Sequence, residues 1–61
     1  MTAYDAYLTA KALADHGIHD SDAVTHADLD AAADHAGASR PADRDDRSAI
    51  RTALDAIGGD R

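Results

Sequence analysis

At the start of two helical stretches of this chain, a threonine is followed three residues later by an aspartate. The two occurrences are Thr2 with Asp5 and Thr25 with Asp28. At this spacing the threonine side chain accepts a hydrogen bond from the third backbone N–H of a helix, and the acidic side chain binds the threonine N–H in return. Two such capping boxes in 61 residues predict short helices, each with its own start.

Glycines provide the matching stop signals. Helices are predicted over residues 3–16, 26–36 and 44–57, and residues 58–61 are expected to form a frayed tail. Gly17, Gly37 and Gly58 are the predicted stops, because glycine readily adopts the left-handed conformation that ends many helices. β-Branched residues are scarce, so strands are not predicted. The predicted fold class is therefore all-α, a small three-helix bundle with short loops in a single domain.

The first helix carries a stripe of Tyr4, Tyr7 and Leu8, and both tyrosines are expected along the edge of its core face with their hydroxyls outward. Leu13 lies on the opposite side of the helical wheel. A Schellman ending at the glycine would give Leu13 a partner in Ile18. A second interpretation of the tyrosines is an exposed patch used for dimerisation, since tyrosine is common at interfaces.

The other two helices carry apolar residues at i, i+3, i+4 and i+7. These are Leu29, Ala32, Ala33 and Ala36 in the second helix, and Ile50, Ala53, Leu54 and Ile57 in the third. Val24 and Leu29 hold the two positions of a hydrophobic staple. Asp43 is the predicted N-cap of the third helix, and Ser39 is a competing start. Because only Leu29 is large in the second helix, this helix must pack closely through alanine or be held by its neighbours.

All twelve acidic residues are aspartate, and they outweigh one lysine and five arginines to give a net charge of −6. Such a surface repels nucleic acid and anionic membranes overall. It suits a basic partner, mimicry of DNA, or a halophilic organism whose salt screens self-repulsion. The absence of cysteine excludes disulfides and thiolate metal sites. No membrane span or signal peptide is visible, so a cytoplasmic location is expected.

Four arginines follow one another at helical spacing. Arg40, Arg44, Arg47 and Arg51 would fall within about 60° of arc on one helix. One interpretation is a docking ridge for carboxylates or phosphates. The other is ion pairing within the chain, of Arg47 with Asp43, of Arg51 with Asp55, and of arginines with aspartates on the second helix.

Residues 25–40 resemble the turn of a helix-turn-helix DNA reader, with Ala33, Gly37 and Ser39 in the expected places. The resemblance weakens in the following helix, because its core positions fall on Asp45 and Ser48. Carboxylates at its start would also meet DNA phosphates. DNA binding is therefore a secondary expectation.

Histidines and aspartates gather in the first connection. His16, His19, Asp20 and Asp22 are all types that ligate divalent ions. The glycine between the two histidines leaves their geometry unfixed, so neither a metal nor any other cofactor is predicted. Neighbouring Asp–His pairs on a helix point apart and form no dyad. A chain this short also has little volume for a substrate pocket, and we expect no enzyme.

The expected function is that of a non-catalytic, acidic helical interaction module that binds another protein, with a homodimer as one form of it. The expected contacts are Arg44, Arg47, Arg51, Tyr4 and Tyr7. Two alternatives stay open. One is a small helix-turn-helix-like transcription regulator that contacts the DNA backbone through the arginine stripe. The other is an acidic inhibitor that mimics DNA.

Overall fold

A computed structural model describes residues 1–59, and these residues form three helices with no strand among them. The helices are α1 (Ala3–Asp15), α2 (His26–Ala36) and α3 (Arg44–Gly59). The predicted all-α three-helix bundle is confirmed. None of these helices combines the length and the apolar character needed to cross a lipid bilayer.

Both predicted capping boxes are present at the starts of α1 and α2. The Thr2 hydroxyl accepts from the Asp5 N–H at 3.1 Å, and Asp5 Oδ2 accepts from the Thr2 N–H at 3.3 Å. Thr25 and Asp28 repeat this exchange, both distances being 3.2 Å. Each box satisfies backbone N–H groups that would otherwise lack a helical partner.

The ends of α1 and α2 also follow the prediction. Gly17 and Gly37 have φ angles of 82° and 71°, in the left-handed region. After α1, the N–H of Ile18 binds the Leu13 carbonyl and the N–H of Gly17 binds that of Ala14, both at 2.9 Å. This is the Schellman pattern, and it folds Ile18 back against the core.

The third helix begins where predicted and ends later. Asp43 Oδ1 accepts from the Asp46 N–H at 3.0 Å, which makes Asp43 the N-cap rather than Ser39. The predicted stop at Gly58 is wrong, because α3 continues through Gly59 and Gly58 does not adopt positive φ. Glycine can also hold helical angles, at a modest entropic cost. Of the predicted frayed tail, residues 60–61 lie outside the described part of the chain.

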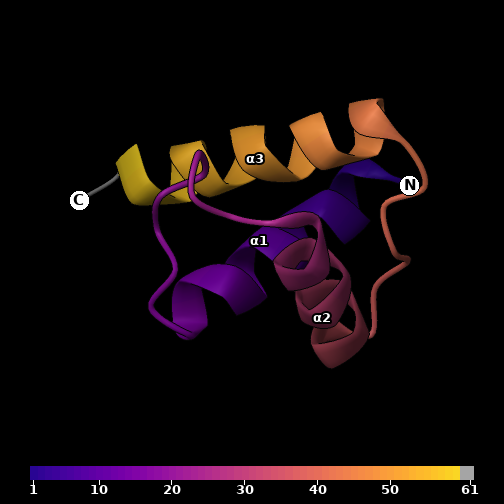
Figure 1. Cartoon of the computed structure of the whole chain (residues 1–61), viewed down its shortest axis with the longest axis horizontal. Helices are drawn as coiled ribbons and strands as arrows, with labels where there is room; N and C mark the ends of the chain where they lie inside the picture. Colours follow the sequence, from indigo (N-terminus) through magenta and orange to yellow (C-terminus); the bar gives the residue numbers. More distant parts are fainter. Residues whose placement is uncertain (60–61) are drawn as a thin grey trace.

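The arrangement of the helices makes α1 the centre of the molecule. Helix α1 packs against both α2 and α3, whereas α2 and α3 scarcely touch each other. Figure 1 shows α1 and α3 starting at the same end of the molecule, while α2 crosses beside them. The amino group of Met1 lies 3.8 Å from Asp46 at the start of α3, which agrees with this arrangement.

The core is built from a few large side chains set among alanines. Its buried members are Ala6, Ala10, Ala12, Leu13, Val24, Leu29, Ala32, Ile50 and Leu54. The predicted inward faces of α2 and α3 are confirmed, because Leu29 and Ile50 have no exposed surface and Leu54 only 1%. One polar residue, Thr9, is fully buried there, and its hydroxyl donates to the Asp5 carbonyl at 2.9 Å.

The predicted inward face of α1 is wrong. Tyr4 and Tyr7 are 68% and 46% exposed, while Leu13, placed opposite them on the wheel, is only 2% exposed. Helix α1 approaches two neighbours at once, and its buried face therefore consists mostly of small residues such as Ala6 and Ala10. Close approach of two helices favours alanine over tyrosine at the contact. The bulky rings are left on the outer side of the helix.

Candidate interaction surface

Three of the predicted site residues meet in one surface concavity. This arginine concavity is lined by His26, Arg44, Arg47, Ser48 and Arg51. The cavity has a volume of about 380 Å³. Spacings of three and four residues place the three arginines on one flank of α3, and the start of α2 adds His26. The sequence predicted the arginines and missed this histidine, which lies in a different helix.

Arg44 and Arg47 have no counterpart in the described part of the chain. Their guanidinium groups make no hydrogen bond or ion pair with any residue in the range 1–59. Two other cations are engaged: Lys11 lies 3.8 Å from Asp15, and Arg40 pairs with Asp34. In a chain with a net charge of −6, carboxylates are abundant, so two unpaired neighbouring arginines mark this surface.

Arg40 does not belong to the arginine concavity. It precedes α3, and its Nε donates to Asp34 Oδ1 of α2 at 2.8 Å, while Nη2 bonds the other carboxylate oxygen. The hydrogen bond from Arg40 lowers the pKa of Asp34 from its ordinary value, and the same contact raises the pKa of Arg40. The predicted four-arginine stripe is therefore wrong in its first member, because the helix starts too late to include it.

The ion-pairing interpretation holds for one arginine only. An arginine does pair with an aspartate of α2, as just described for Arg40. The pairs of Arg47 with Asp43 and of Arg51 with Asp55 do not form among the described residues. Asp55 instead accepts a hydrogen bond from the Ser21 hydroxyl.

One wall of the concavity is tied to the first connection. Arg51 donates from Nη1 to the backbone carbonyl of Ser21. The Ser21 hydroxyl donates to Asp55 Oδ1 at 2.6 Å. Ser21 is only 8% exposed, and both contacts, which are partly buried, hold the connection against α3. Arg51 thus has a structural task, which Arg44 and Arg47 lack within residues 1–59.

Helix dipoles raise the positive potential of the concavity further. Arg44 is the first residue of α3, and His26 is the first residue of α2. The N-terminal end of a helix carries a partial positive charge and favours anions. The first-turn aspartates of these helices partly offset this charge, but none of them lines the concavity. Asp45 lines a groove on the other flank of α3, Asp46 lies 3.8 Å from the Met1 amino group, and Asp28 accepts from the Thr25 N–H. The concavity therefore combines arginines with the starts of two helices, an arrangement that favours anions.

The tyrosines occupy another part of the surface. Neither Tyr4 nor Tyr7 lines the arginine concavity. Both are exposed on α1, so they and the arginines are not brought together into one small site. A partner that contacts all five predicted residues would have to span both regions.

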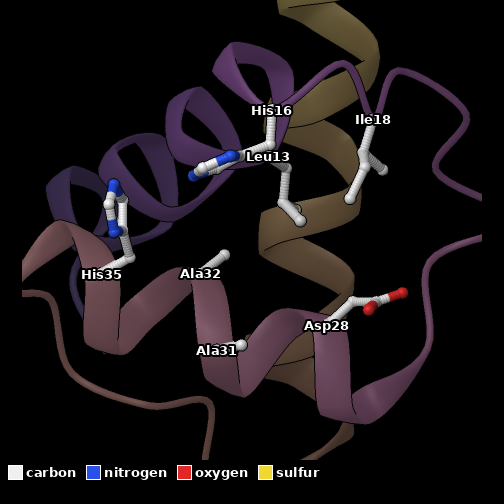
Figure 2. A pocket seen from close by; sticks show the side chains of 7 residues that line it. All are labelled: Leu13, His16, Ile18, Asp28, Ala31, Ala32 and His35. Atoms are coloured by element: carbon white, nitrogen blue, oxygen red, sulfur yellow. The ribbon is translucent and has the colours of Figure 1, made fainter.

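A second concavity, called the histidine groove below, was not predicted. Figure 2 shows His16 and His35 pointing toward each other across it, from the ends of α1 and α2. Their ring centroids are 4.9 Å apart, with the rings at 69° to each other. The groove measures about 310 Å³, and its other lining residues are Leu13, Ile18, Asp28, Ala31 and Ala32. Its sequence signal is the Ala-Asp-His run that closes both helices.

The sequence alone left the geometry of the histidines in the first connection unfixed. In the structure His16 meets His35 of α2, and residues 1–59 contain no group of three or more ligand side chains placed to hold a metal.

The helix-turn-helix geometry is not supported. Helices α2 and α3 scarcely touch, and residues 37–43 separate them, whereas that motif uses a turn of about 3–4 residues.

Comparisons of the chain with protein-family models, curated proteins and solved structures find no match.

Proposed function

We propose that this chain is a non-catalytic interaction module that binds an acidic segment of a partner protein in the arginine concavity. The observation that supports this most is the pair Arg44 and Arg47, whose guanidinium groups have no internal partner in residues 1–59. Guanidinium binds carboxylates through two parallel hydrogen bonds. A glutamate- or aspartate-bearing segment would supply the missing acceptors.

The charges around the concavity favour one position for such a segment. The partner's carboxylates would lie over Arg44 and Arg47, near the starts of α2 and α3, and the rest of the surface, with its excess of aspartate, would repel them. This contrast in charge supports the arginine concavity as the binding site of an acidic segment. Arg51 would contribute less, because it already donates to Ser21.

The exposed tyrosines extend the proposal to a second copy. Tyr4 and Tyr7 present large, amphipathic rings on the outer side of α1, and such rings lose little conformational freedom on binding. Sedimentation equilibrium of the chain and of a Tyr4→Ser/Tyr7→Ser variant tests this part. A dimer that the variant loses supports it, and a monomer at all concentrations contradicts it.

Selection from a random peptide library displayed on phage tests the main proposal. We expect the selected peptides to be rich in Asp and Glu, and to bind an Arg44→Gln/Arg47→Gln variant at least tenfold more weakly. Arg40→Gln is the matched control, because it removes a cation outside the concavity and should leave peptide affinity unchanged. Selection of basic peptides would contradict the proposal and favour the DNA mimic.

Titration with duplex DNA separates the remaining alternative. A transcription regulator would bind the duplex with an affinity that falls steeply as salt is raised. We expect no binding at physiological salt, because a net charge of −6 opposes it. Binding that is lost in Arg44→Gln/Arg47→Gln would assign the arginines to the DNA backbone and overturn the protein-binding proposal.

A further inference from the structure

The two imidazoles of the histidine groove lie at a separation that suits a shared metal ion. A metal–nitrogen bond of about 2.0–2.1 Å, added to the roughly 1.2 Å from nitrogen to ring centre, puts two imidazole centroids on one metal roughly 4.5–5.3 Å apart for ligand angles of about 90–110°. The observed centroid separation is 4.9 Å. Both side chains are exposed, so their rings can turn to present nitrogens to one ion.

The helix ends around this pair favour a cation. His16 is the C-cap of α1, and His35 lies in the last turn of α2. The C-terminal end of a helix carries a partial negative charge. Two such ends meet at the histidine pair (Figure 2). A dication placed between the rings would therefore interact favourably with both helices as well as with its ligands.

The neighbouring carboxylates are already engaged. Asp15, next to His16, lies 3.8 Å from Lys11, and Asp34, next to His35, is bound by Arg40. This leaves two imidazoles as the protein ligands, which agrees with the lack of any larger group of ligand side chains in residues 1–59. Water would fill the other coordination positions of a bound ion.

We propose that His16 and His35 form a two-imidazole site for a late first-row divalent metal ion. Imidazole suits Cu²⁺, Ni²⁺ and Zn²⁺, and Cu²⁺ binds a given nitrogen site most tightly of these. The site is separate from the arginine concavity, so it stands or falls independently of the proposed partner binding. A bound ion would link the end of α1 to the end of α2.

Calorimetric titration of the tag-free chain with Cu²⁺ tests the proposal. We expect one tight site per chain, and at least tenfold weaker binding in His16→Ala and in His35→Ala, because each variant keeps only one of the two ligands. His26→Ala is the matched control, since it removes an exposed histidine at the other end of α2, and it should change the affinity by less than twofold. Circular dichroism confirms that the variants fold, as expected for exposed side chains.

Electron paramagnetic resonance of the Cu²⁺ complex gives a second measurement that does not depend on variants. Two equatorial imidazole nitrogens in the wild-type chain are the expected result. A single imidazole, or equal loss of affinity in His16→Ala, His35→Ala and His26→Ala, would overturn the proposal and show scattered binding to surface groups.

Discussion

The two ends of α2 are opposites in electrostatic terms. At its first residue, His26 lies beside three arginines at the positive end of the helix dipole, where cations are unfavourable. In its last turn, His35 lies at the negative end and meets His16 from the end of α1. The C-terminal end of α2 therefore finds its partner, His16, within the chain. At the N-terminal end, Asp28 is engaged with Thr25 in the capping box, whereas Arg44 and Arg47 have no partner among residues 1–59, which is why we propose that a partner binds there.

Helix α2 itself is held mainly through one large side chain, and replacing it gives the largest expected effect. Leu29 is fully buried, whereas the other inward residues of α2 are alanines. Leu29→Ala should lower the free energy of unfolding by about 2–5 kcal/mol, comparable to the roughly 3–9 kcal/mol expected of a whole chain this size. Loss of this anchor would disturb the arginine concavity at one end of α2 and the histidine groove at the other.

Urea unfolding followed by far-ultraviolet circular dichroism measures this loss. Leu8→Ala is the control, because Leu8 is only half-buried on α1 and its removal should cost less than half as much. Equal effects of the two substitutions would contradict the assignment of Leu29 as the main anchor of α2.

Glycines at two helix ends give the next largest contrast. Gly37 ends α2 with a φ of 71°, so Gly37→Ala should lower the free energy of unfolding by about 1–2 kcal/mol. Gly58 keeps helical angles inside α3, and a Cβ there would meet only the His19 carbonyl oxygen at 4.0 Å. Gly58→Ala should therefore raise stability by about 0.5–1 kcal/mol. Thermal unfolding measures both, and destabilisation by Gly58→Ala would show that α3 ends earlier.

The arginines themselves separate into structural and unpaired members. Arg51→Gln removes the bond to the Ser21 carbonyl and should cost about 0.5–1.5 kcal/mol. Arg44→Gln/Arg47→Gln removes two unpaired cations from the positive end of α3 and should raise stability by about 0.3–1 kcal/mol. Thermal unfolding at low salt measures the difference. A loss of stability in the double variant would reveal an internal role for these arginines.

The smallest expected effect concerns the exposed pair at the far end of α2. Arg40 lowers the pKa of Asp34 below its ordinary value of 3.8. The pair therefore stabilises the fold above that value, and its contribution is lost as pH falls through the lower folded-state pKa. The Tm difference between the wild type and Arg40→Gln should be constant near neutral pH and close in acid. A difference that persists in strong acid would have another cause.

The sequence predicted local features better than the packing between helices. Thr2, Thr25 and Asp43 were identified as N-caps because capping depends on residues within one turn. The inward face of α1 was predicted wrongly, because the helical wheel alone placed the edge of the core at Tyr4 and Tyr7. Which face is buried depends on how closely two neighbouring helices approach α1, and no single helix contains that information.

The candidate site shows the same difference between features within one helix and contacts between helices. Arg44, Arg47 and Arg51 share a flank of one helix, so their spacing was enough to group them. His26 of α2 joins the arginines of α3, and His16 at the end of α1 meets His35 of α2, so both features depend on contacts between two helices. Such contacts follow from the crossing of α1 and α2, and the repeated Ala-Asp-His run indicated only that both helices end in similar chemistry.

Binding at Arg44 and Arg47 is tested most directly by nuclear magnetic resonance titration of the chain with a short polyglutamate peptide. We predict that the side-chain Nε–H signals of Arg44 and Arg47 and the backbone signals of His26 and Ser48 shift together, while Arg40 and Lys11 stay unchanged. No shift in the arginine concavity, or larger shifts at Arg40 and Lys11, would contradict the proposed binding surface.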